Sequence, residues 1–512
     1  MIKRQRNKDF SWSLLHNLLA IFSIVSLLTG MRIATLNNEE MLFFSALLPQ
    51  GYVHGIHLFS AIGLIATVTT YFLYKYIIQK QYNINLIHII LLGLIFSGLS
   101  IYFSFLSSIA TVLDVHYYLA IVMFLWIINH FYDKVIIKGL QSFMQILNFN
   151  RLVSKRTFAT IVVLAIISSI TVWIFRFYNT QILHVAKIPN DIFIKIDGVD
   201  SEAIWKNAKP VTIHAYGGAN FKNGATDITV KALHNDKEIY FLITWDDPTK
   251  SIRHLPLMKT KNGWKVIQDG FYSFDERSYY EDKLAIMFSK NGCFGASKTA
   301  HLGAKPLKDK QANWSQKGYH YTTDNSLHDL WQWKATRSNH MSMATDCYFA
   351  QPATLKVGKR RYKAGYQCDD KYSGGFTMNY KWYKKDIVTP KRMPRNPQWL
   401  DKFQISNQNL EWIIPWYDFK PYNKNDDNYS VGTIMPSVIY KSNKEEGDRA
   451  DVSAFGIYKN GKWQVELVRF LNTNSKYDLE IKTGMHMWVS AFDHVQIAHT
   501  RESRALYLEL EK

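Results

Sequence analysis

Residues 113–134 read LDVHYYLAIVMFLWIINHFYDK, and this stretch carries two histidines, His116 and His130, inside an otherwise apolar run. Asp114 and Asp133 bracket eighteen uncharged residues. A run of this length is close to the roughly 20 apolar residues that a helix needs to cross a bilayer. The stretch therefore predicts a transmembrane helix that carries two imidazoles, and it sets the fold class of the amino-terminal part of the chain.

Other long uncharged runs precede residue 180, and together they predict five transmembrane helices, the element that satisfies its own backbone hydrogen bonds in lipid. The five runs are Phe10–Met31, Tyr52–Tyr74, Tyr82–Leu113, Val115–Tyr132 and Thr157–Phe175. The opening residues MIKRQRNK also suit a cleaved signal peptide. Since no small-residue cleavage site follows Gly30, we expect the first run to be retained as a helix.

Basic residues gather before the first run, after the second, and between the fourth and fifth, so the positive-inside rule predicts a cytoplasmic amino terminus. These residues are Lys3, Arg4, Arg6, Lys8, Lys75, Lys80, Lys134, Lys138, Arg151, Lys155 and Arg156. An odd number of spans then places everything after Arg176 outside. The expected location is a bacterial cytoplasmic membrane, crossed several times, with a periplasmic carboxyl-terminal domain.

Four histidines fall at two depths of the predicted bundle. A helix turns about 100° and rises about 1.5 Å per residue, so His116 and His130 share one face and lie about 21 Å apart along the axis. His16 on the first run matches the inner depth of His130, and His57 on the second matches the outer depth of His116. Two stacked bis-histidine iron sites are what a transmembrane electron pathway requires.

Histidines also hydrogen-bond across helix bundles, and that reading stays open for each of the four taken singly. His54 is an alternative to His57, because it lies about one turn earlier on the same side of its helix. His88 has no counterpart at the outer depth of its own helix. We therefore interpret His88 as structural.

The second half of the chain changes to the two-residue alternation of β-strands. Residues 226–247, TDITVKALHNDKEIYFLITWDD, predict a hairpin that turns at Asn235–Asp236. Its two apolar faces carry Ile228, Val230, Ala232, Ile239, Phe241, Ile243 and Trp245. The segments DKLAIMFS, LWQWKATR, GKWQVELVRFL and ALYLELE behave similarly. The expected fold is an all-α transmembrane bundle over residues 1–180, followed by an all-β, sandwich-like exported domain over residues 181–512.

The three cysteines all lie in the exported half. An oxidising compartment permits a disulfide, and we expect it between Cys347 and Cys368, with Cys293 left over. The sequence contains no Cys-x-x-Cys-His motif, which excludes standard covalent attachment of a c-type haem.

Residues 10–135 resemble the bacterial di-haem cytochrome b family, the membrane subunits that serve hydrogenases and formate dehydrogenases. Residues 11–31, SWSLLHNLLAIFSIVSLLTGM, are similar to the first helix of that family, with an early histidine and a late Thr-Gly. The pair of histidines fourteen positions apart is similar to its fourth helix. The resemblance implies two b-type haems whose ligands are His16, His57, His116 and His130.

The exported half resembles the haem-binding gamma subunit of ethylbenzene dehydrogenase and its relatives. The similar strings occur in family order: DGVDSEAIWKNA, VKALHNDKEIYFLITWDD, EDKLAIMFS, LWQWKA and DVSAFGIYKNGKWQVELVRFL. The resemblance implies a β-sandwich that holds one b-type haem through a methionine and a lysine.

This chain departs from that ligand pattern. The family methionine corresponds to residues 292–306, GCFGASKTAHLGAKP, which contain His301 and Cys293 but no methionine, and the lysine falls near Ser453. A third haem therefore needs a different pair of ligands. His301 is the best single candidate, with Met435 or Met341 as the second ligand. A thioether through Cys293 is a weaker alternative, and His301 is also readable as an ordinary loop histidine.

These patterns predict a membrane-bound b-type cytochrome that carries electrons between a quinone pool and a periplasmic cytochrome or oxidoreductase subunit, rather than a stand-alone catalyst. We find no catalytic residue set in the sequence. The exported half has 48 Lys and Arg residues against 37 Asp and Glu residues, a net charge of +11. We interpret this surplus as a lysine-rich composition; the alternative is that it steers an acidic protein partner. No nucleic-acid partner is expected. The alternative is a membrane-anchored module that recognises a small ligand or protein, with histidines that only pack.

Overall fold

The computed structural model describes most of the chain. The described residues are 10–34, 47–48, 53–78, 80, 83–103, 109–137, 155–178, 181–268, 276–290, 299–302, 319–322, 325–354, 364–370, 374–384, 387–407, 410–502 and 504–512. The chain divides into two compact units, Met1–Thr180 and Gln181–Lys512. The first unit is helical and the second is built mainly of β-strands, which confirms the predicted fold class.

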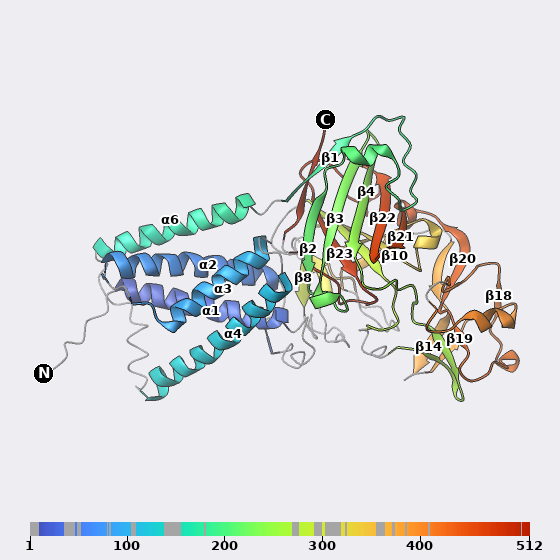
Figure 1. The fold of residues 1–512 in the computed structure, drawn as a ribbon, viewed down its shortest axis with the longest axis horizontal. Helices are drawn as coiled ribbons and strands as arrows, with labels where there is room; N and C mark the ends of the chain where they lie inside the picture. Colours follow the sequence, from blue (N-terminus) through green and yellow to red (C-terminus); the bar gives the residue numbers. More distant parts are fainter. Residues whose placement is uncertain are drawn as a thin grey trace. The chain divides into compact units, whose positions relative to one another are not determined.

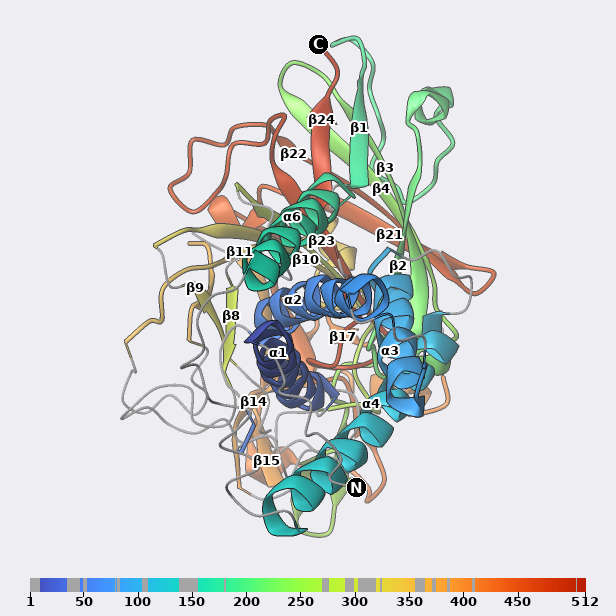
Figure 2. The ribbon, with the colours of Figure 1, turned by 90° about the vertical axis from the view of Figure 1, so that its left-hand side faces the viewer.

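Among the described residues, five helices of the first unit are long and apolar enough to cross a membrane. They are α1 (Phe10–Ala34), α2 (Val53–Leu73), α3 (Leu86–Phe103), α4 (Ile109–Phe131) and α6 (Lys155–Tyr178). The π-helical segments η2 (Tyr74–Ile78) and η3 (Tyr132–Ile137) extend α2 and α4. Figures 1 and 2 show how α1 packs against α2, α6 against both, and α3 against α4.

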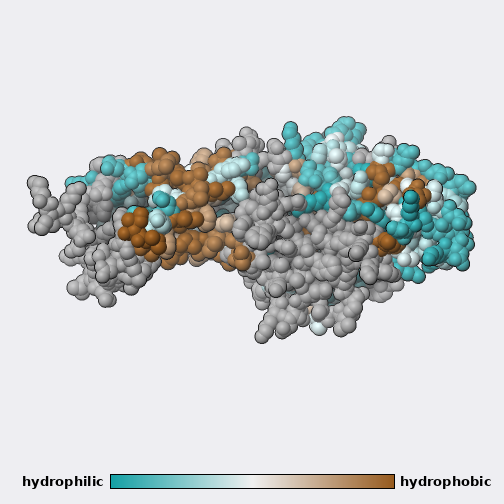
Figure 3. Space-filling model, turned by 90° about the horizontal axis from the view of Figure 1, so that it is seen from below, coloured by the Kyte–Doolittle hydropathy of each residue, from teal (hydrophilic) through white to brown (hydrophobic). Residues whose placement is uncertain are grey.

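The outer surface of the helical unit is apolar. Phe59, Phe96, Leu125 and Phe158 are each more than half exposed, and hydrophobic residues predominate on the visible face of this unit's described part in Figure 3. Water would oppose such exposure, whereas lipid tails accept it. The surface therefore suits a unit that lies in a bilayer.

One predicted boundary was wrong. The run Tyr82–Leu113 is divided between two helices, because α3 ends at Phe103 and α4 begins at Ile109, which places Asp114 inside α4. A span needs only about 20 residues. The run is longer than that, so it completes one helix and also starts the next.

The second unit is based on a twelve-stranded sheet. In spatial order its strands are β12 (Tyr366–Cys368), β11 (Thr345–Phe349), β10 (His328–Lys334), β7 (Lys283–Ser289), β23 (His486–Phe492), β24 (Leu506–Leu510), β1 (Gln181–Lys187), β3 (Ala225–His234), β4 (Glu238–Asp246), β22 (Lys462–Phe470) and β21 (Ser453–Lys459), and β2 (Val211–Tyr216) pairs with β3. Strand β1 is parallel to both its neighbours, β24 and β3. Because its first residues pair with β24 and its last two with β3, β1 joins the two halves of the sheet.

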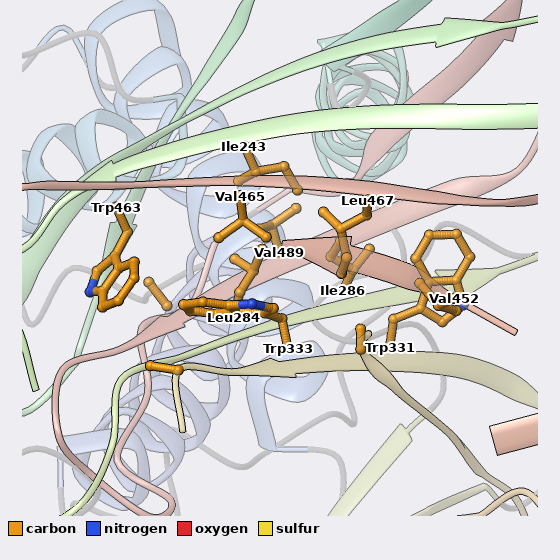
Figure 4. Close-up of a cluster of buried hydrophobic side chains, with 14 of the residues drawn as sticks. Ile243, Leu284, Ile286, Trp331, Trp333, Val452, Trp463, Val465, Leu467 and Val489 are labelled. Atoms are coloured by element: carbon orange, nitrogen blue, oxygen red, sulfur yellow. The ribbon is translucent and has the colours of Figure 1, made fainter. Parts of the chain in front are cut away.

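The two halves enclose the core of the unit. Figure 4 shows Ile243 and Val465, from β4 and β22, facing Leu284 and Trp333, from β7 and β10. These four side chains are at most 1% exposed. Burial of apolar area on both inner faces is the main stabilising term of a sandwich, at about 25 cal/mol per Å².

The predicted hairpin is confirmed. Strands β3 and β4 pair antiparallel, and Asn235 Oδ1 in the turn accepts the backbone N–H groups of Lys237 and Glu238. Ile228 and Phe241, one from each predicted apolar face, are fully buried. The other predicted segments form β7, β10, β22 and β24.

Smaller sheets complete the unit. They contain β5 (Leu257–Thr260), β6 (Gly263–Val266), β8 (Thr299–Leu302), β9 (Tyr319–Thr322), β13 (Gly374–Met378), β14 (Tyr380–Lys384), β15 (Ile387–Pro390), β16 (Arg392–Pro394), β17 (Ile413–Ile414), β18 (Phe419–Pro421), β19 (Ile434–Met435) and β20 (Val438–Glu445). Cys347 and Cys368 are register partners on β11 and β12 and form a disulfide, which confirms the predicted pair. Cys293 lies outside the described residues.

Truncating a core tryptophan tests this packing. We expect Trp333→Ala to lower the free energy of unfolding of the β unit by about 3–5 kcal/mol, because it leaves a cavity and removes the hydrogen bond from Trp333 Nε1 to Asn339 Oδ1. The control is Trp416→Ala, since Trp416 is 47% exposed. Thermal unfolding followed by near-ultraviolet circular dichroism of the purified full-length protein compares the two. Equal losses would contradict the assigned core.

Candidate functional site

The two histidines expected at the inner depth lie close together. The ring centroids of His16, on α1, and His130, on α4, are 6.3 Å apart with planes inclined by 42°. Each ring also stacks on a tryptophan four residues earlier in its own helix. Trp12 and His16 have centroids 4.9 Å apart, and Trp126 and His130 have centroids 4.8 Å apart. Residues four apart share a helix face, so each tryptophan holds its histidine ring in one orientation. We call His16 and His130 the inner pair.

His57, on α2, is held by the neighbouring helix α1. Its Nδ1 atom lies 3.0 Å from the carbonyl oxygen of Ser26 and 3.0 Å from the hydroxyl oxygen of Thr29. A carbonyl oxygen can only accept, so Nδ1 carries the hydrogen and donates it. In the neutral ring Nε2 then keeps the lone pair, which is the form that binds a metal.

His116, on α4, repeats this arrangement against α3. Its Nδ1 atom lies 2.9 Å from the hydroxyl oxygen of Ser97. That hydroxyl donates its own hydrogen to the carbonyl oxygen of Gly93, at 2.7 Å, so it accepts the hydrogen bond from His116 Nδ1. Nε2 again keeps the lone pair. We call His57 and His116 the outer pair.

A glycine lies beside each ring of the outer pair. A Cβ atom at Gly30, after Thr29, would lie 3.1 Å from Cε1 of His57. A Cβ atom at Gly98, after Ser97, would lie 3.3 Å from Cε1 of His116. Both distances are shorter than ordinary carbon contacts of about 3.5–4.0 Å. The absence of a side chain at these positions lets each imidazole lie directly against the backbone of the next helix.

The other two histidines of the helical unit differ. His88 Nδ1 accepts the backbone N–H of Asn85 at the start of α3, at 2.9 Å, and its ring packs near Tyr71 and Phe72. These contacts support the structural interpretation of His88. The side chain of His54 lies outside the described part of α2, so the choice between His54 and His57 as a ligand stays a prediction.

In the β unit, His301 lies on β8 as the register partner of His320 on β9; its side chain is outside the described part of the chain. Burial and, secondarily, Arg501 lower the pKa of His320 to about 4. Burial also lowers the pKa of His499 to about 3, although the backbone hydrogen bond to Thr500 opposes this shift, and the charge of His320 lowers it further. Both imidazoles are therefore neutral near pH 7.

Met435 and Met341, the two methionines predicted as a possible second haem ligand beside His301, lie among other side chains. Met435 is fully buried on β19, and its Sδ lies 3.8 Å from the side-chain nitrogen of Asn379. Met341 packs against the cluster that contains Ile413 and Val438. Ser453 is exposed at the start of β21. At the aligned lysine position the structure thus has a serine, so the methionine and lysine pair that the gamma-subunit resemblance implies is incomplete there.

Comparison with known proteins bears on the β unit. The family model described as ethylbenzene dehydrogenase matches residues 202–504. The chain belongs to the ethylbenzene dehydrogenase family. This match lies within the β unit and agrees with the resemblance of that half of the sequence. A comparison with curated proteins finds no match.

Solved structures resemble this family member weakly. A family 9 carbohydrate-binding module from Caldicellulosiruptor kristjanssonii, in complex with cellotriose, aligns with 65% of this chain and 95% of its own, at 9% identity and a TM-score of 0.23. A putative carbohydrate-binding protein from Bacteroides uniformis aligns with 65% of this chain and 99% of its own, at 8% identity and a TM-score of 0.25. Scores this low carry no argument about function.

Sequence reasoning found the four histidines but missed the residues that hold them. The repeat of Trp-x-x-x-His at 12–16 and 126–130 was readable from the sequence. The Ser-Gly at 97–98 is chemically similar to the Thr-Gly at 29–30, and that likeness was the available signal. The partnership of each dipeptide with a histidine of another helix emerged only from the packing.

Alanine at Gly98 tests the close approach of His116. In a helix, alanine is favoured over glycine by about 1 kcal/mol. At Gly98 we expect overpacking against the imidazole, which typically costs about 1–3 kcal/mol, to reverse that gain. Gly93→Ala on the same helix is the control, because its Cβ would meet only the flexible end of Leu119, at 3.1 Å.

The measurement is thermal unfolding of the detergent-solubilised protein, followed by the helical circular dichroism signal. Gly98→Ala should melt below the Gly93→Ala control. A melting temperature at or above that of the control would mean that His116 does not lie against α3.

Proposed function

We propose that this protein is a membrane-bound b-type cytochrome that carries electrons across the bilayer, between a quinone and a redox partner that meets the β unit. Two haems would lie in the helical unit, one held by His16 and His130 and the other by His57 and His116. The amino terminus would be cytoplasmic and the β unit periplasmic. The disulfide Cys347–Cys368 supports an oxidising compartment for that unit.

The main support for this proposal is the distance between the ring centroids of His16 and His130. With about 2 Å between a metal and each imidazole nitrogen, two rings on opposite sides of one ion have centroids roughly 6 Å apart. A direct N–H···N hydrogen bond between the rings would bring the centroids to roughly 5 Å. The observed 6.3 Å between His16 and His130 matches the first arrangement.

The outer pair supports the same chemistry through its hydrogen bonds. A ligating histidine usually donates its other ring N–H to a protein oxygen, which fixes the tautomer and makes the ligating nitrogen more basic. His57 and His116 both do so. Among the described residues we find no hydrogen bond to Nε2 of either ring, so both lone pairs are available to iron.

Haem iron, when bound, supplies the one-electron chemistry. The chain's own part is to position the rings and to exclude water. Trp12 and Trp126 stack on the inner rings, while Ser26 and Ser97 orient the outer ones. The apolar helices keep the surroundings at a low dielectric, which tunes a redox potential.

Membership of the ethylbenzene dehydrogenase family supports a redox association for the β unit. Because serine stands at the aligned lysine position, Ser453, we derive no electron-transfer step through a haem in that unit. The hairpin β8–β9, which carries His301 and His320, is the part of the unit to which we assign any third haem.

Haem stoichiometry tests the proposal directly. The pyridine haemochrome assay on the full-length protein, purified in detergent, should give about two b-type haems per chain, or about three if the β8–β9 hairpin contributes one. Absence of haem would contradict the proposal and favour the membrane-anchored binding module.

Single substitutions test the pairing. His130→Ala and His116→Ala should each remove one haem and leave the other, because each deletes one of the two histidines that would hold a different haem. His88→Gln is the matched control, since it changes a histidine of the same unit that caps α3 and should retain full haem content. The assignment fails if His116→Ala keeps all haem or if His88→Gln loses as much as His116→Ala. Comparing His54→Ala with His57→Ala decides between those two residues.

A further inference from the structure

A group of carboxylates surrounds one buried arginine in the β unit. Arg469, on β22, is 1% exposed. Its Nη1 atom lies 2.8 Å from Oδ2 of Asp329, 3.3 Å from Oδ2 of Asp346 and 3.5 Å from Oδ2 of Asp478. One guanidinium therefore serves three carboxylates that come from distant parts of the sequence.

Asp369 approaches this group from another direction, directly after β12. It is fully buried, and no N–H or hydroxyl donor among the described residues reaches its carboxyl group, which instead faces that of Asp478. The nearby Arg449 donates to the backbone oxygen of Asp369, not to its carboxylate. One oxygen each from Asp346, Asp369 and Asp478 lie within 4.8 Å of one another.

Acidic groups outnumber basic ones in this cluster. Five carboxyl groups, those of Asp329, Asp346, Asp369, Asp451 and Asp478, gather around the guanidinium of Arg469. An uncompensated buried charge is costly, and in proteins such charges are paired or coordinate a metal. Asp329, Asp346 and Asp478 each also have one carboxylate oxygen without a described partner.

We infer that Asp346, Asp369 and Asp478 bind a calcium ion. Ca²⁺ takes oxygen ligands at about 2.3–2.6 Å, so two of its ligands lie at most about 5 Å apart, and the three oxygens meet that limit. Mg²⁺ usually keeps several of its waters, and a cage of buried carboxylates suits it less. The site is independent of haem in either unit.

The disulfide holds two of the three ligands in place. Asp346 precedes Cys347 and Asp369 follows Cys368, and these cysteines are register partners joined by the bond. The backbone N–H of Asp369 also donates to the carbonyl oxygen of Asp346, at 3.3 Å. Strands β11 and β12 thus present both carboxylates from a cross-linked pair of strands, which lowers the entropy lost when the ion binds.

A second acidic group in the β unit makes a useful contrast. Asp282, Asp493 and His494 also lie close together. There the carboxylate of Asp282 accepts hydrogen bonds from Trp463 Nε1 and from the backbone N–H groups of Ser251 and His494. Its oxygens are already satisfied, whereas those of Asp369 are not.

Calcium-dependent stability tests the inference. The full-length protein in detergent is treated with a chelator, and its thermal unfolding is then followed while CaCl₂ or MgCl₂ is added. We expect Ca²⁺ to raise the unfolding midpoint of the β unit, because an ion that binds the folded state stabilises it by mass action. Mg²⁺ should have a much smaller effect.

Terbium provides a second readout. Trp331 lies against the guanidinium of Arg469, with 4.7 Å from Cζ to the ring centroid, so excitation of tryptophan should sensitise the luminescence of Tb³⁺ bound beside it. Added Ca²⁺ should displace Tb³⁺ and abolish that signal.

Asp369→Asn separates a cation ligand from a merely structural residue. Without Ca²⁺ this variant should be about as stable as the wild type, since the amide has nearly the size and shape of the buried carboxyl group that it replaces. With Ca²⁺ it should be the less stable of the two, with affinity reduced at least about tenfold. Asp370→Asn, which removes an exposed neighbouring charge, is the control and should behave as the wild type.

The inference is overturned if Ca²⁺ neither shifts the wild-type midpoint nor displaces Tb³⁺. It is also overturned if Asp369→Asn binds Ca²⁺ as tightly as the Asp370→Asn control.

Discussion

Polar imidazoles inside apolar helices are the constraint on which the helical unit depends. A polar group left unsatisfied in apolar surroundings costs about 2–7 kcal/mol, so each ring needs a partner. His57 and His116 find theirs on the next helix, in Ser26 and Ser97. These hydrogen bonds fix α1 against α2 and α3 against α4, and the close approach requires the neighbouring glycines, Gly30 and Gly98. Packing and hydrogen bonding in this unit therefore act on the same two side chains, His57 and His116.

Buried polar groups also need partners in the β unit, where they are an arginine and several carboxyl groups. Its apolar core, which includes Trp333 and Trp463, packs between the two halves of one sheet. Beside that core, Arg469 brings together carboxyl groups from β10, β11 and the loop that follows β22. Burial makes each of these charges depend on the others. The ethylbenzene dehydrogenase family match lies within this unit. The proposed role of the histidines in the helical unit is based instead on their distances and hydrogen bonds.

Local patterns predicted most of the fold. The spans were readable because a helix must cover the bilayer with apolar residues, and the β3–β4 hairpin because strands alternate with a period of two. The boundary between α3 and α4 was misplaced, since uncharged residues continue across it and hydropathy gives no signal there. Helical rise also placed His16 beside His130 in depth, and the structure brings these two rings together.

The sequence by itself determined the two-part architecture, the five apolar helices and the β3–β4 hairpin, because all of these follow from length and periodicity. Tertiary structure alone decided which side chains hold those histidines, such as Ser97 for His116. It also decided that Asp346, Asp369 and Asp478 meet. Such contacts join residues that are distant in the chain, and their distances depend on how whole elements pack, which no local pattern encodes.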